Sequence, residues 1–147
     1  MNITLWEANQ TIRGALSQAR LLSVRVSVSV CDVYGHLIAH QRMDSASSDS
    51  SWDSIGKAIA AAAEGRPSGA LITEFERFPR TGLVTARGAP YLRRPGGLPI
   101  VGRGKFQGSI GVRGASTDQQ DEDCARAGVM TLDFSTASRG KKISSEE

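Results

Sequence analysis

The chain has 147 residues, of which 39% are hydrophobic and 22% are charged, and its formal net charge is +3 at pH 7. This composition is typical of one folded domain, and the apolar run over residues 58–63 is far shorter than the roughly 18 residues that a membrane span needs. The arginines are dispersed and no aromatic residues interleave with them, which disfavours nucleic-acid binding. The N-terminus lacks the features of a secretory signal, so we expect a cytoplasmic protein with reduced cysteines.

The first part of the chain predicts a helix followed by a β-hairpin. Apolar residues at helical spacing predict an amphipathic helix from Leu5 to Leu22. Valine at every second position from Val24 to Val30 is typical of a strand with one apolar face. Turn residues fill Asp32–Gly35, and His36–Arg42 then resumes as a strand, which together predict an antiparallel hairpin.

Small residues and chain breakers dominate the middle of the sequence. The serine-rich segment Asp44–Ser51 is expected to be a loop, after which Asp53 or Ser54 caps a small-residue helix that ends near Glu64. The segment Ser68–Phe78 favours a second short helix. Glycine and proline are so dense over residues 79–97 that we expect a long surface excursion with room for one short strand.

The last part of the chain predicts a second hairpin and a third helix. Leu98–Val101 and Gly108–Val112 are the expected strands, joined by a turn at Gly102–Lys105. Thr117 caps the final helix with Gln120 three residues later. We expect one domain over residues 1–133 and a disordered tail over residues 134–147. Hairpin connections rather than crossovers indicate an α+β fold with helices packed on an antiparallel sheet.

Three sets of side chains carry alternative interpretations. His36 and His40 share a face of the predicted strand, where they would form a two-histidine metal or heme edge, or else both point to solvent. The segment Arg42–Asp44 ends that strand and either lines a cleft or forms a surface ion pair beside a gap-filling methionine. Lys57 either meets an anionic group or is solvated.

Two further segments are rich in small residues, and the sequence allows two interpretations of each. The alanine-rich helix around Ala61 has side chains small enough for close packing against the sheet or against a second subunit. Gly96 and Gly97 either present unpaired backbone N–H groups to a ligand or form a plain turn. Neither pattern carries an obligatory reaction chemistry, so the catalytic residues are unknown.

Several segments, taken together and in order, resemble one known family. They are Val26–Val30, Asp32–Ala39, Arg42–Asp44, Ile55–Ala58, Gly96–Ile100, Gly108–Ala115, Asp121–Glu122 and Ala127–Gly128. Over Ile12 to Leu132 the chain resembles the GlcG / HbpS-like family, a heme-degrading-type domain that also forms the C-terminal part of PduO proteins.

The resemblance implies an α/β sandwich with a five-stranded antiparallel sheet, flanking helices and assembly into symmetric oligomers, from dimer to octamer. It also implies heme as a cofactor of some members. The positions that match the family's motifs, and that we expect to bind ligand, are Arg42, Met43, Asp44, Lys57, Gly96, Gly97, Arg113, Gly114, Asp121 and Glu122. Heme-binding members are expected to use a histidine of the N-terminal helix, which Leu5–Leu22 lacks. The substitutes would be His36, His40, Met43 or Tyr34.

These observations support one leading hypothesis and two alternatives. The leading hypothesis is an oligomeric protein that binds an anionic small molecule or a tetrapyrrole, heme or corrinoid, with Arg42, Lys57 and Arg113 as donors. The first alternative is an enzyme of small-molecule catabolism in which a pocket carboxylate, Asp44, Asp121 or Glu122, is the general base. The second is a ligand-free assembly module whose interface is the alanine-rich helix.

Overall fold

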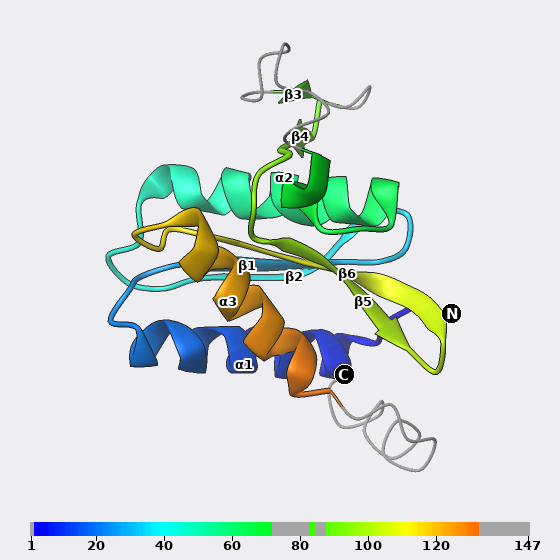
Figure 1. Cartoon of the computed structure of the whole chain (residues 1–147), viewed down its shortest axis with the longest axis horizontal. Helices are drawn as coiled ribbons and strands as arrows, with labels where there is room; N and C mark the ends of the chain where they lie inside the picture. The colour runs from blue at the N-terminus through cyan, green and yellow to red at the C-terminus, as the bar shows by residue number, and fades with distance from the viewer. Residues whose placement is uncertain (1, 72–82, 85–87, 133–147) are drawn as a thin grey trace.

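Three layers form the part of the chain that the computed structural model describes, residues 2–71, 83–84 and 88–132 (Figure 1). Helix α2 (Ser48–Glu64) covers one face of a central sheet, and helices α1 (Leu5–Leu21) and α3 (Asp118–Met130) cover the other. The sheet is antiparallel with strand order β2-β1-β6-β5. Its strands are β1 (Ser27–Cys31), β2 (Leu37–Arg42), β5 (Gly97–Gly102) and β6 (Lys105–Arg113).

The α+β class is confirmed, but the expected number of strands was wrong. The main sheet has four strands, not five, and the short strands β3 (Leu83–Val84) and β4 (Pro90–Tyr91) pair separately in a sheet of two strands. Both predicted hairpins are present. The β5–β6 turn is closed by Arg103 and Gly104 with φ angles of 56° and 71°, a conformation that suits a two-residue hairpin loop.

Polar residues at the first positions of α1 and α3 explain where these helices begin. The side chain of Thr4 accepts a hydrogen bond from the backbone N–H of Glu7, and the Glu7 carboxylate accepts from the backbone N–H of Thr4. Thr117 caps α3 by accepting from the backbone N–H of Gln120, as the spacing predicts. In both helices, therefore, a side-chain oxygen pairs one of the backbone donors that the first turn leaves without an intrahelical partner.

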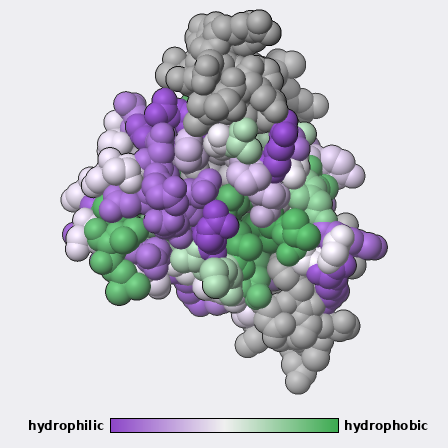
Figure 2. Space-filling view, viewed as in Figure 1, coloured by the Kyte–Doolittle hydropathy of each residue, from purple (hydrophilic) through white to green (hydrophobic). Residues whose placement is uncertain are grey.

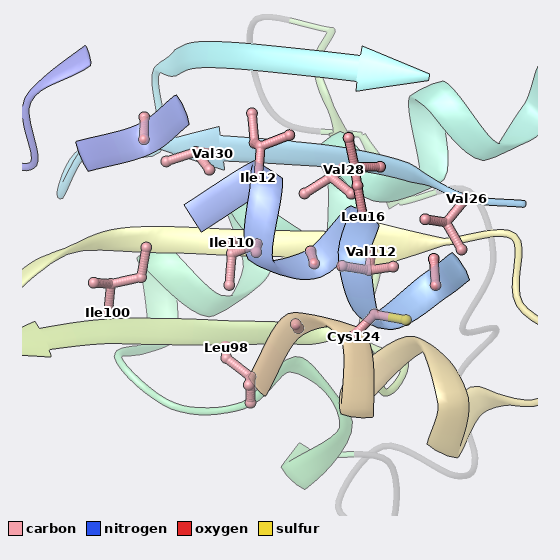
Figure 3. Packing of buried hydrophobic residues seen from close by; sticks show 14 of the residues in the cluster. Ile12, Leu16, Val26, Val28, Val30, Leu98, Ile100, Ile110, Val112 and Cys124 are labelled. Carbon is pink, nitrogen blue, oxygen red and sulfur yellow. The ribbon is translucent and has the colours of Figure 1, made fainter. Parts of the chain in front are cut away.

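The alternation of valine and serine in β1 reflects two buried faces of the sheet. All five residues of β1 are buried. Val28 packs among the apolar residues that lie between the sheet and helices α1 and α3 (Figure 3). Ser27 and Ser29 face α2 instead, where their hydroxyls bond to those of Ser50 and Ser54 at 2.8 Å in both pairs. The polar face of the strand is thus buried by hydrogen bonding rather than exposed to solvent.

Helix α2 starts earlier than expected. The segment Asp44–Ser51 was predicted to be a loop, but Ser47 is the N-cap and Ser48 begins the helix. The prediction of Asp53 or Ser54 as the cap was wrong because serines in the first turns bury their hydroxyls. Ser50 and Ser54 donate to the carbonyls of the preceding turn while they bond to β1.

The alanine-rich face of α2 packs against the sheet of its own chain. Ala58, Ala60 and Ala61 are fully buried. Gly111 of β6 allows the close approach, because a Cβ atom there would lie 2.0 Å from the carbonyl oxygen of Ser54. The alternative in which these alanines form a subunit interface is therefore wrong.

Two predictions for the rest of the chain are settled only in part. A 3-10 helix (Ser68–Leu71) opens the predicted short helix, whose remaining residues 72–78 lie outside the described residues. The expected tail over residues 134–147 also lies outside them.

On the face shown in Figure 2, apolar residues gather over β5, while α3 presents hydrophilic residues. Within the described ranges, no helix is both long and apolar enough to cross a membrane.

Candidate functional site

A hollow opens between the C-terminal end of α1 and the end of β2, and we call it the arginine cavity. It has a volume of about 300 Å³. Its lining residues are Leu16, Arg20, Arg25, Gln41, Arg42, Met43 and Asp44. A second hollow of about 370 Å³ shares Arg20, Arg25 and Met43 with it. These volumes are at the lower end of the roughly 300–1,000 Å³ that is usual for small-ligand sites.

Local backbone geometry brings the three arginines of the cavity together. Arg20 lies in the last turn of α1, and Ser23, with a φ angle of 56°, reverses the chain so that Arg25 precedes β1. Gly114 lies against this segment with a φ angle of 126°, and a Cβ atom there would be 2.4 Å from the carbonyl oxygen of Arg25. Arg42 ends β2 on the neighbouring strand.

Met43 forms the wall of the cavity and is fixed by two hydrogen bonds to β1. Its thioether sulfur accepts from the backbone N–H of Val26 at 3.3 Å, and its own N–H donates to the carbonyl of Val26 at 2.9 Å. The side chain also packs against the core. Met43 therefore contributes shape and an apolar surface, and its sulfur is already engaged.

The lining of the cavity carries excess positive charge. It contains Arg20, Arg25 and Arg42 against the carboxylate of Asp44. Within the described part of the chain, none of these three arginines forms an ion pair. Guanidinium groups bind carboxylates and phosphates through paired hydrogen bonds, so the cavity is suited to an anionic group.

Lys57 and Asp121 lie elsewhere, in a fully buried ion pair. The Lys57 Nζ donates to Asp121 Oδ2 at 3.0 Å and to the carbonyl of Val112 at 2.9 Å. The other carboxylate oxygen of Asp121 accepts from the backbone N–H of Ala115 at 2.9 Å. Burial lowers the pKa of the Lys57 amine and raises the pKa of the Asp121 carboxyl, while each charge opposes the shift of the other. The alternative of a solvated Lys57 is wrong.

Gly96 and Gly97 belong to this buried cluster. A Cβ atom on Gly96, whose φ angle is 128°, would lie 2.8 Å from the Lys57 Nζ. The N–H of Gly97 donates to the Ser68 hydroxyl at 2.8 Å, so the idea that it presents an unpaired donor to a ligand is wrong. The two glycines make room for the lysine and the helix that carries it.

The remaining expected positions lie around the start of α3. Arg113 is 3.4 Å from an Asp53 carboxylate oxygen and 3.9 Å from that of Asp121, at the edge of the buried pair. Glu122 pairs with Arg126 at 3.1 Å on the same helix. Arg113, Lys57, Asp121 and Glu122 do not line the arginine cavity, so the structure brings only Arg42, Met43 and Asp44 of the expected ligand set together there.

The two histidines do not form a pair. His36 precedes β2 in the turn, where it is exposed and lies 3.7 Å from a carboxylate oxygen of Asp32. His40 lies within β2 and its Nδ1 is 2.8 Å from the hydroxyl of Ser29. Burial, followed by the nearby positive charge of Arg42, lowers the pKa of His40. Among the described residues, no group of three or more His, Cys, Asp or Glu residues is arranged to hold a metal ion.

The geometry does not favour Asp121 as the general base of the enzyme alternative. A general base near neutral pH needs a raised pKa and access to the substrate. Asp121 has the raised pKa, but it is fully buried and both of its oxygens are engaged in hydrogen bonds. It therefore lacks the contact with a substrate that this chemistry requires.

Comparisons with known proteins identify the family. A model of the family described as "Haem degrading protein HbpS-like" matches residues 3–130. The chain belongs to the HbpS-like family. A comparison with curated proteins finds no match.

Several solved structures share this fold. A double variant of HbpS from Streptomyces reticuli is 30% identical, with a TM-score of 0.79 over 91% of this chain and 89% of that one. The Klebsiella pneumoniae protein ORFY is 26% identical, with a TM-score of 0.77 over 88% and 89% of the two chains. A structure of a PduOC:heme complex is 24% identical, with a TM-score of 0.77 over 92% and 99%.

Sequence reasoning missed Arg20 and Arg25. Both lie more than fifteen residues before Arg42 in the chain, and only the pairing of β1 with β2 brings the segments together. One signal was present in the sequence, since Arg20 and Arg25 bracket the predicted boundary between helix and strand, a place where side chains gather at the edge of a sheet. The contact of Ser29 with His40, and that of Ser54 with Ser29, were missed because the partners lie on different elements.

Proposed function

We propose that this HbpS-like protein is an oligomer that binds a small anionic ligand in the arginine cavity, and that the ligand is a carboxylate-bearing tetrapyrrole, heme or a corrinoid. The observation that carries the proposal is the convergence of Arg20, Arg25 and Arg42 on one hollow. Family membership and the heme that a structural neighbour binds support the finer choice of ligand.

The residues present fit the carboxylate end of such a ligand. A cavity of about 300 Å³ has room for an anionic arm, with the rest of a macrocycle lying over the rim. Three guanidinium groups offer more donors than one carboxylate can accept, so the lining suits a ligand that carries two carboxylates. The apolar wall that Leu16 and Met43 provide suits the hydrocarbon part of the arm.

A titration with ferric heme tests the proposal, with the dimethyl ester of heme as the matched ligand. The ester lacks both carboxylates and keeps the macrocycle and the iron. We expect saturable binding of heme and at least about tenfold weaker binding of the ester, because hydrogen bonds to a charged group contribute roughly 1.5–3 kcal/mol.

Two arginine variants locate the site. Arg25→Gln removes a guanidinium from both hollows, and we expect it to weaken heme binding about tenfold. Arg13→Gln, on an exposed position of α1 that lines neither hollow, is the control and should bind as the wild type does. Equal binding of heme and its ester, or equal binding by the two variants, would remove the arginine cavity from the proposal.

The oligomer that we propose associates through the outer side of α2. Trp52 of α2 is a large apolar side chain that is 65% exposed, and burial of such a side chain on association is favourable. The cytoplasmic location expected from the sequence stays a prediction.

A further inference from the structure

A chain of hydroxyl groups determines which nitrogen of His40 carries the proton. The Ser54 hydroxyl donates its single proton to the carbonyl of Ser51 at 2.8 Å. Either oxygen could donate in the contact of 2.8 Å between the Ser54 and Ser29 hydroxyls, and with the Ser54 proton already in use the proton of Ser29 is the one available for it. The contact of 2.8 Å between Ser29 and His40 is then left to a proton on Nδ1 of the ring.

The proton on Nδ1 leaves Nε2 as a free electron-pair donor. A neutral imidazole carries one proton only, on one of its two ring nitrogens. The two ring nitrogens lie on opposite sides of the imidazole, so Nε2 is directed away from Ser29 and the buried gap under α2. No hydrogen bond to Nε2 is formed within the described part of the chain. A neutral imidazole held through its other N–H is the arrangement of histidines that ligate metals.

The surroundings of His40 restrict the kind of metal that it can bind. No group of three potential ligands exists among the described residues, so a bare ion would find too few donors. A metal in a tetrapyrrole already has four nitrogen ligands from the macrocycle and needs a single axial donor from the protein. Arg42 lies two residues farther along β2, on the same face of the strand as His40, and also lines the arginine cavity.

We propose that His40 Nε2 is the axial ligand of a metal-centred tetrapyrrole, and that Ser29 and Ser54 are positioning residues that hold the ring in the ligating tautomer. The proposal rests on the proposed function, whose ligand it specifies. It places the metal at His40 and a carboxylate of the ligand at Arg42. It also explains how this chain binds a tetrapyrrole although α1 contains no histidine.

Nuclear magnetic resonance of the ligand-free protein tests the tautomer. The chain has two histidines, so ¹⁵N-histidine labelling gives a simple spectrum that His36→Asn assigns. We expect His40 to show a protonated Nδ1 and an unprotonated Nε2. Ser54→Ala frees the Ser29 proton, which should then be donated to Nδ1 and move the ring proton to Nε2. Ser50→Ala, which breaks the matching Ser27–Ser50 contact, is the control and should leave the His40 signals unchanged. A wild-type ring protonated on Nε2 would overturn the assignment.

Ferric heme titrations of the same variants test ligation. His40→Asn keeps a donor for Ser29 and lacks Nε2. It should bind heme roughly tenfold or more weakly and lose the nitrogen-ligand signature in the electron paramagnetic resonance spectrum. Ser54→Ala should weaken binding in the same range, as the loss of outer-shell partners usually does, and Ser50→Ala should not.

The outcomes separate the two proposals. If wild-type protein and His40→Asn bind heme equally well while Arg25→Gln binds weakly, the His40 ligand is overturned and the arginine cavity stands. If His40→Asn loses binding and Arg25→Gln does not, the arginine cavity is overturned and the ligand stands. No saturable heme binding by the wild-type protein overturns both the heme choice and the axial ligand.

Discussion

The substitution Asp121→Asn tests how strongly the buried ion pair holds α3 against the rest of the molecule. Both side chains of the pair are fully buried, and the Lys57 Nζ lies 3.0 Å from the Asp121 carboxylate. Asparagine keeps an oxygen for the N–H of Ala115, so the substitution removes mainly the charge. A buried lysine left without its counter-charge costs about 3–5 kcal/mol, a large part of the roughly 5–15 kcal/mol by which domains are stable. We expect a loss of about 3 kcal/mol, since the Val112 carbonyl still accepts from Nζ.

The double variant Lys57→Met/Asp121→Asn distinguishes the effect of losing one partner of the ion pair from the effect of losing both. It leaves no buried charge at this position, so we expect it to be more stable than Asp121→Asn alone, although it lacks both native groups. Urea unfolding followed by circular dichroism at pH 7 measures both losses. A loss below about 1 kcal/mol for Asp121→Asn, or losses that simply add in the double variant, would refute this account of the pair.

Three further predictions concern the room for a side chain at Gly96, the assembly of the chain and the dependence of stability on pH. Gly96→Ala should lower the free energy of unfolding by about 2 kcal/mol or more, because a Cβ atom there would lie 2.5 Å from a β6 carbonyl oxygen. Gly104→Ala is the control: its Cβ atom would meet no atom within 4 Å, so it should lower the free energy of unfolding by about 1 kcal/mol, from its positive φ alone. Trp52→Glu should sediment as a smaller species than the wild type, and Leu21→Glu, at a position that is 80% exposed, should not; equal sedimentation would remove α2 from the interface. The pKa of His40 is lowered in the folded protein, so the unfolded chain binds a proton at this ring more readily than the folded chain does. The stability that the neutral ring contributes is therefore present above its ordinary pKa of 6.5 and is lost as the pH falls below that value. Urea unfolding of His40→Asn should show a weaker dependence on pH between pH 7 and 5.

Local patterns allowed much of the fold to be predicted from the sequence. The turn at Asp32–Gly35 is confirmed, with the Asp32 carboxylate accepting from the N–H groups of Tyr34 and His36. The cap at Thr117 is confirmed for the same reason, since cap and partner lie three residues apart. Such interactions depend on neighbours in the chain, which the sequence displays directly.

The errors arose where residues far apart in the chain decide the outcome. Ser50 was expected in a loop and Ser54 was a candidate helix cap, and only the serines of β1 explain the burial of both hydroxyls within a helix. For Lys57 the sequence left open whether the side chain meets an anionic group or is solvated, because its partner Asp121 is 64 residues away. The site shows the same limit: Arg42 was found from its place at a strand end, whereas Arg20 and Arg25 join it only through tertiary packing.

Hydrogen–deuterium exchange with and without ferric heme locates the ligand directly and tests the central claim that it binds at the arginine cavity. Mass spectrometry of peptides reports the protection along the chain, whatever the size of the oligomer. The account predicts slower exchange over residues 16–25 and 40–44 in the presence of heme, since these segments line the cavity and carry His40. Protection confined to α3 or β5, with these two segments unchanged, would contradict it.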